Sequence, residues 1–270
     1  MHLMKLISLS LCLLCCELSL AQTNKDWAEL SFQDGEILTY VIYYNWGMIW
    51  VPAGEVKFEI TEHDNHIEFD VIGRTFSSYD SMFKVRDYYT SEVDKSTMYP
   101  INFRRDVLEG NYQRFDSIWF DQQTGELVEY FGRSRQSARK FEFEVDNKVH
   151  DMVSAIYNIR TEELESYSDG DQIPVDIFFD KEFFAINVKF NGIKTRKIKG
   201  LGKMSTYHLQ PALIDGYVFS EGDVMDIWVS VDGNQIPLMI ESPITIGSVK
   251  AVLSGVKNTK YENRALPLRQ

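Results

Sequence analysis

Apolar and polar residues alternate with a period of two along most of this chain. The clearest runs are Val56–Ile60, Ile67–Val71, Phe141–Val145 and Phe184–Phe190. Such alternation is typical of a strand with one buried face and one solvated face. Sheets of this kind are antiparallel, because parallel sheets are covered on both sides. The chain is therefore predicted to be mainly β, with a large antiparallel curved sheet in the form of a half-barrel or a sandwich.

Turn-forming residues separate these runs. Gly125 ends a loop that starts at Asp121, Asp232-Gly233-Asn234 separates two later runs, and His63–His66 closes another pair. Asn191-Gly192 supplies the two positive-φ residues that a type I′ hairpin needs. Counted between such turns, the chain contains about a dozen strands or more, with the spacing of sandwiches and barrels.

One segment has the period of a helix instead. In Asp151–Thr161 the apolar residues recur every three to four positions, and His150 or Asp151 is suited to cap the first turn. With the acidic stretch that follows, we expect one central helix at about 150–165. The region 147–172 is the one candidate seam between two halves. Because no linker accompanies it, residues 22–270 are predicted to form a single β-rich domain.

The N-terminal residues 1–21 have the three parts of a secretory signal peptide. Lys5 precedes a short apolar run, and Ser19-Leu20-Ala21 places small residues at the −3 and −1 positions of a cleavage site. All three cysteines, at positions 12, 15 and 16, lie in this segment. A lipidated cysteine is the weaker alternative, because leucine or cysteine precedes each candidate. Cleavage after Ala21 leaves a chain without thiols.

Composition and charge limit the classes of partner and the cellular compartment that are expected for this chain. The formal net charge is −12 at pH 7, which disfavours nucleic acid and anionic membrane surfaces, since both repel an acidic chain. Export without disulfides favours a bacterial periplasm or cell exterior. No later stretch is long and apolar enough to span a bilayer, so no transmembrane segment is expected in the mature chain. The oligomeric state is left open.

Three stretches in order resemble a known family. They are Gly35-Glu36-x-Leu38-x-Tyr40 with Pro52-Ala53-Gly54-Glu55, then Asp151-x-x-Ser154-Ala155-x-Tyr157-x-x-Arg160, and finally Ile227-Trp228-Val229-Ser230-x-Asp232-x-Asn234-x-Ile236-Pro237 with Gly247-Ser248-Val249-Lys250-Ala251. Together they resemble the exported bacterial domain-of-unknown-function family numbered 3108. The resemblance covers about residues 35–253 and implies a β-rich protein of the periplasm or cell surface of a Gram-negative bacterium. It implies no catalytic or ligand residues.

No motif of a known catalytic site is complete. Ser137-x-x-Lys140 lacks its partner motifs and runs into a strand pattern. Gly200-Leu201-Gly202-Lys203 resembles part of a phosphate loop but has no surrounding βαβ unit. We therefore predict no catalytic residue and no cofactor, and an uncharacterised hydrolase is the third functional hypothesis.

His63 and His66 flank a two-residue turn and would face each other across a hairpin. Such a pair holds a divalent metal if Glu62, Asp64 or Glu68 supplies a third ligand. A solvated polar hairpin tip explains the same residues, so the sequence assigns no metal site.

Aromatic residues gather between positions 40 and 50, and Tyr40, Tyr44, Trp46 and Trp50 are the candidate ligand-binding residues. A strand that is apolar on both faces is either packed in a core or lines an apolar cavity. The first functional hypothesis is accordingly a non-enzymatic envelope protein that binds an apolar or amphipathic ligand such as a lipid. The alternative is a structural or interaction module that binds a protein or glycan through its sheet edges or through a basic rim, for which the lysine and arginine residues between positions 189 and 203 are candidates.

Overall fold

The alternating runs form one open sheet. The computed structural model describes residues 27–46, 49–212, 224–243 and 247–262. Within these ranges the chain forms fourteen strands, which are β1 (Ile37–Trp46), β2 (Ile49–Glu62), β3 (His66–Thr75), β4 (Val85–Asp94), β5 (Pro100–Glu109), β6 (Tyr112–Phe120), β7 (Glu126–Gly132), β8 (Arg139–Glu144), β9 (Gln172–Phe179), β10 (Glu182–Ile198), β11 (Gly202–Pro211), β12 (Asp226–Ser230), β13 (Pro237–Pro243) and β14 (Ser248–Lys257). The predicted signal peptide, residues 1–21, lies outside these ranges.

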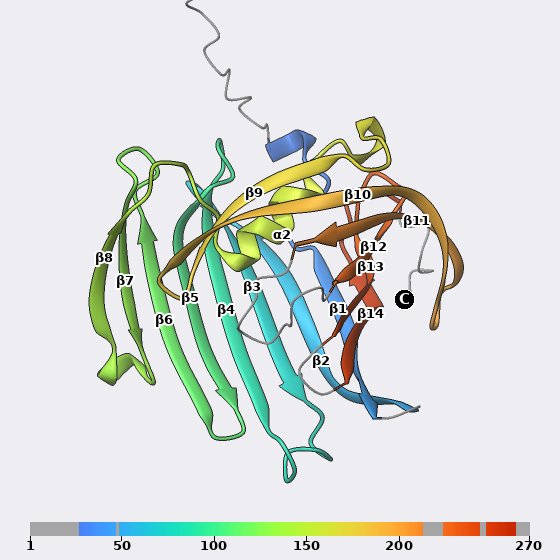
Figure 1. Cartoon of the computed structure of the whole chain (residues 1–270), viewed down its shortest axis with the longest axis horizontal. Helices are drawn as coiled ribbons and strands as arrows, with labels where there is room; N and C mark the ends of the chain where they lie inside the picture. Colours follow the sequence, from blue (N-terminus) through green and yellow to red (C-terminus); the bar gives the residue numbers. More distant parts are fainter. Residues whose placement is uncertain (1–26, 47–48, 213–223, 244–246, 263–270) are drawn as a thin grey trace, which may run out of the picture.

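Strands that follow one another in the sequence are neighbours in the sheet, except for β8 and β9. Their order in the sheet is β8-β7-β6-β5-β4-β3-β2-β1-β14-β13-β12-β11-β10-β9. All thirteen strand pairings are antiparallel, and β1 joins the two runs by pairing with β14 as well as with β2. The sheet curves strongly, and β8 and β9 remain its two edges (Figure 1). The predicted antiparallel, curved, mainly β fold is confirmed, and the sheet does not close into a barrel.

Most predicted turns are present, but one is not. The loops at His63–His66, Asp121–Gly125 and Asp232–Asn234 connect neighbouring strands. The hairpin predicted at Asn191-Gly192 is wrong, because these residues lie inside the long strand β10. They form an irregularity opposite β11, where the register shifts between Phe190 and Ile193. The hairpin turn that precedes β10 is instead Asp180-Lys181, and both residues have positive φ.

Helix α2 (Met152–Arg160) is the predicted central helix, shorter than expected. The Asp151 side chain accepts hydrogen bonds from the backbone N–H groups of Val153 and Ser154, which caps the first turn as predicted. The acidic stretch does not extend the helix. Gln235 donates to the carbonyls of Arg160 and Glu162, and a short 3₁₀ turn, η3 (Leu164–Ser166), follows.

Two further 3₁₀ turns are η1 (Trp27–Glu29) and η2 (Arg135–Ser137). In the described part of the chain, no helix is both long enough and apolar enough to cross a membrane.

Helix α2 lies in the hollow of the sheet, where the long β9–β10 hairpin crosses over it (Figure 1). It packs against β3, β4 and β9. The Tyr157 ring stacks on Phe69 of β3 with centroids 3.8 Å apart, and Phe32 meets Tyr157 edge-on at 5.2 Å. At the other end of the helix, Ser91 of β4 donates to the Asp151 carboxylate over 2.6 Å.

The helix divides the buried apolar residues. Val153 and Tyr157 belong to the cluster on the inward face of the first half of the sheet. Ala155 belongs to a second cluster with strands β9 to β12. A third cluster surrounds β1, β13 and β14. The sheet therefore wraps around the helix, and the two halves of the sheet use different sides of the helix as part of their core.

Arg160, the last residue of α2, fixes the helix in this hollow. Its guanidinium donates two hydrogen bonds, of 2.6 and 3.0 Å, to the two carboxylate oxygens of Glu36, and a third of 3.0 Å to the carbonyl of Asn234. Arg160 and Glu36 are both almost completely buried. Removing one partner of a buried ion pair leaves an uncompensated charge, which costs about 3–5 kcal/mol.

We predict that Glu36→Gln lowers the melting temperature by roughly 10 °C, since each kcal/mol corresponds to about 2–4 °C in a chain of this size. Thermal unfolding followed by circular dichroism measures the change. The matched control is Glu142→Gln, which removes an exposed ion pair with Lys140 and should change stability by less than about 1 kcal/mol. Equal melting temperatures for Glu36→Gln and the parent protein would contradict this role of the ion pair.

Candidate functional site

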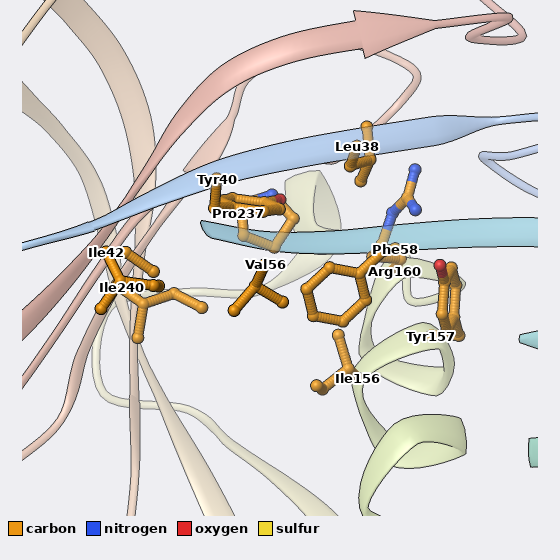
Figure 2. A pocket seen from close by; sticks show the side chains of 11 residues that line it. Leu38, Tyr40, Ile42, Val56, Phe58, Ile156, Tyr157, Arg160, Pro237 and Ile240 are labelled. Carbon is orange, nitrogen blue, oxygen red and sulfur yellow. The ribbon is translucent and has the colours of Figure 1, made fainter. Parts of the chain in front are cut away.

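The space between helix α2 and strands β1 and β2 is not filled. An inner cavity of about 140 Å³ lies there. Figure 2 shows its lining, which is almost wholly apolar and consists of Leu38, Tyr40, Ile42, Val56, Phe58, Ile156, Tyr157, Arg160, Pro237, Ile240 and Ala251. Ile156 extends from the helix towards Phe58 and is 38% exposed. An apolar side chain of the central helix is therefore left partly uncovered at this cavity.

A larger outer cavity of about 660 Å³ adjoins the inner one. The two share Ile42 and Val56 as lining residues. The outer cavity continues along β1 to β4 and under the loop between β3 and β4, and its apolar lining includes Tyr44, Val51, Tyr79, Met82, Phe83, Val85 and Val249. Met82 and Phe83 are strongly exposed at its rim.

Strand geometry explains why these side chains face one space. Successive residues of a strand point to opposite faces, so Leu38, Tyr40, Ile42 and Tyr44 of β1 share the inward face. In the pairing with β2 they stand opposite Phe58, Val56, Gly54 and Val51, respectively. Gly54 allows the backbones of β2 and β3 to lie close together, because a Cβ atom there would lie 2.4 Å from the Arg74 carbonyl oxygen.

Three carboxyl groups interrupt the apolar wall of the outer cavity. They belong to Glu55 of β2, Asp87 of β4 and Glu109 of β5. Burial and, to a smaller extent, the negative charge of Glu109 together raise the pKa of Asp87 to about 7. Asp87 accepts a hydrogen bond from the backbone N–H of Leu108. Arg74 also lines this cavity, and its positive charge is paired with the Glu55 carboxylate at a distance of 2.7 Å. The outer cavity is thus apolar with an acidic end.

The four sequence-predicted residues do not form one group. Tyr40 lines the inner cavity and Tyr44 the outer one. Trp50 stands opposite Asn45 in the β1–β2 pairing, on the other face of the sheet, and Lys250 lies 3.9 Å above its ring. Trp46 ends β1, and its side chain is outside the described residues.

Sequence reasoning missed most of the lining. Ile42, Val56 and Phe58 carry a signal, because they lie on the same alternating pattern as Tyr40 and Tyr44. Ile156 and the rim residues Met82 and Phe83 carry none that the sequence reveals. They come from a helix face and a loop whose positions depend on the tertiary fold.

A second group of titratable side chains lies beneath the β9–β10 turn. Arg105 of β5 is 3.2 Å from the Asp116 carboxylate and also pairs with Asp180 of the turn. Asp116 and Glu129 are fully buried. Burial and the neighbouring Asp116 raise the pKa of Glu129 well above its usual range, and burial likewise raises that of Asp116. Neither carboxyl lines the inner or the outer cavity, so this acidic cluster is separate from both.

The residues that carried the family resemblance have mainly structural positions. Glu36, Arg160 and Asn234 make the buried ion-pair network, and Asp151 with Ser154 forms the helix cap. Tyr40 and Tyr157 line the inner cavity as well.

Comparison with known proteins agrees with this architecture. A family model described as "Protein of unknown function (DUF3108)" matches residues 39–254. The chain belongs to this family. No curated protein matches the DUF3108 chain.

Among solved structures, the chain is similar to the crystal structure of a beta-barrel-like protein of domain of unknown function DUF1849 from Brucella abortus. The two share 11% sequence identity, with a TM-score of 0.55 over 85% of this chain and all of that one. At this identity the likeness concerns the fold alone.

The buried acidic cluster predicts a pH dependence of stability. A pKa that is raised in the folded state contributes stability that is present below the pKa of the unfolded chain, about 4.3 for glutamate, and is lost as the pH rises through the raised value. Glu129→Gln removes this titration. We expect the melting temperature of Glu129→Gln, relative to the parent protein, to be several degrees higher at pH 8 than at pH 5.

Differential scanning calorimetry at the two pH values measures this difference. The matched control is Glu126→Gln, an exposed glutamate on the same strand, for which the difference should not change with pH. A Glu129→Gln variant whose relative melting temperature is the same at both values would show that Glu129 titrates normally.

Proposed function

We propose that this DUF3108 protein binds an apolar or amphipathic molecule, such as a lipid, in the adjoining inner and outer cavities. We also propose that it does so without catalysis, as an exported protein of the periplasm or cell surface. The observation that supports binding most directly is the inward-facing apolar lining that remains uncovered. Val56 and Phe58 follow the alternation of a buried strand face, yet both are only half-buried.

The dimensions favour a ligand with a chain. The outer cavity falls within the range of about 300–1,000 Å³ that is common for small-molecule sites. Burying one methylene group contributes about 0.8 kcal/mol, so ten buried methylenes contribute about 8 kcal/mol before the cost of association is subtracted. Affinities in the micromolar range or weaker are therefore expected. Asp87 and Glu109 give the ligand's polar end a place at the acidic side of the outer cavity.

Ile42 offers a direct test, because it belongs to both cavities. Ile42→Trp adds an indole to the shared wall and should fill space without removing a buried contact. We expect native mass spectrometry of the parent protein, purified from its own cells without detergent, to reveal a bound lipid-sized mass. The Ile42→Trp variant should retain less than about a tenth of this adduct, with a melting temperature within a few degrees of the parent.

The matched control is Trp119→Ala, which changes an exposed aromatic residue outside both cavities and should leave the adduct unchanged. A fluorescent monoacylglycerol analogue, whose uncharged hydroxyl head suits the acidic end of the outer cavity, is titrated into each protein and gives an independent affinity. Absence of the adduct from the parent protein, together with absence of binding of this analogue, would exclude this function.

One observation favours the alternative of an interaction module. Trp119 of β6 and Tyr130 of β7 are 52% and 41% exposed. Trp119 pairs with Val128, two residues from Tyr130, so the two aromatic rings lie on the same face of adjacent strands. Exposed aromatic residues are enriched at protein interfaces. In this case Trp119→Ala, rather than Ile42→Trp, should abolish binding to the protein or glycan partner.

A further inference from the structure

We propose that the hairpin between β2 and β3 binds a divalent zinc ion through His63, His66 and Glu68. The sequence places the two histidines on either side of a turn but does not show which acidic residue joins them. The structure assigns that third residue. One ligand atom from each of the three side chains lies within 4.8 Å of the others.

The hairpin geometry brings these side chains together. The backbone N–H of His63 donates to the carbonyl of His66 over 2.9 Å and closes the turn. The two imidazole rings are stacked, with centroids 4.4 Å apart and planes inclined by 15°. Glu68 is two residues after His66 on β3 and so points to the same face. Its Oε1 atom lies 3.9 Å from Nε2 of His63.

Only a small movement separates this arrangement from a coordination sphere. Zinc–nitrogen and zinc–oxygen bonds of about 2.0–2.2 Å at a tetrahedral angle place neighbouring ligand atoms about 3.3–3.6 Å apart. The His63 and Glu68 side chains are 42% and 28% exposed, so they can rotate without displacing the core. The ligand atoms can therefore approach one another by changes in side-chain rotamer alone.

The donor set selects the kind of metal. Two imidazole nitrogens and one carboxylate oxygen match a zinc site with three protein ligands and a water in the fourth position. Calcium and magnesium prefer sites built from oxygen atoms.

The surrounding charge favours a cation as well. Glu68 stands directly opposite Glu92 of β4, and His66 stands opposite Asp94. A bound dication would offset the repulsion among these carboxylates, which gives the site an electrostatic gain in addition to the three metal–ligand bonds.

The site is separate from the ligand cavities. Ile67 and Phe69, which alternate with His66 and Glu68 on β3, are buried in the core, so the zinc ligands point to the opposite face. The inference does not depend on the proposed lipid binding, and either can fail without the other.

Isothermal titration of the full chain with zinc chloride tests the site. The protein should carry no polyhistidine tag and should first be treated with a chelator that is then removed. We expect one zinc ion per chain with a dissociation constant in the micromolar range. We also expect a higher melting temperature with zinc than without it, because an ion that binds only the folded state stabilises it.

Each of His63→Gln, His66→Gln and Glu68→Gln should weaken zinc binding at least tenfold, as expected when a metal ligand is lost. Their melting temperatures in the presence of chelator should remain near that of the parent, because these side chains are at least partly exposed. The matched control is Glu144→Gln, which alters an exposed carboxylate on edge strand β8 and should bind zinc like the parent. Zinc binding that survives the His63 and His66 substitutions, or that is absent from the parent protein, would overturn the proposal.

Discussion

The arrangement of the sheet around its helix depends on one buried guanidinium. Arg160 pairs with Glu36 at the start of β1 and with the Asn234 carbonyl in the β12–β13 turn. The Arg160 carbonyl accepts hydrogen bonds from Ser31 and Gln235. Three segments far apart in the sequence, around residues 31–36, 160 and 234–235, thus meet at the end of α2. A buried charge tolerates few alternative geometries, so this network fixes where the helix can lie.

The cavities follow from the length of the helix that is fixed in this way. Nine residues at about 1.5 Å each span about 13 Å. Ten-residue strands such as β1 and β3 span about 33 Å at about 3.3 Å per residue. The helix is therefore less than half as long as these strands. Beside it, apolar side chains of β1 and β2 line the inner and outer cavities.

Local sequence patterns predicted the parts of the fold that local chemistry determines. Alternation found the strands, and Asp151 with the helical spacing after it found the start of α2. The Asp180-Lys181 turn was missed, because lysine is not a typical residue for positive φ, whereas Asn191-Gly192 has the composition of a turn but lies within β10. The candidate site depended on pairing register. Trp50 is close to Tyr44 in sequence, but its place opposite Asn45 directs it to the other face. The Glu36–Arg160 pair joins residues 124 positions apart, which no local pattern reveals.

The position of β1 between β2 and β14 has a consequence for how the chain reaches this fold. Strands β2 to β8 are joined in sequence order, as are β9 to β14, so each run can form through contacts between neighbouring segments. The two runs are joined by the β1–β14 pairing, which brings Ile37 opposite Lys257. Contacts between residues so far apart in the sequence form slowly because closing the long loop between them costs entropy. Until β14 has been synthesised, β1 has a hydrogen-bonding partner on one side only. The completed sheet is therefore expected to appear late in folding, by the joining of two preformed meanders.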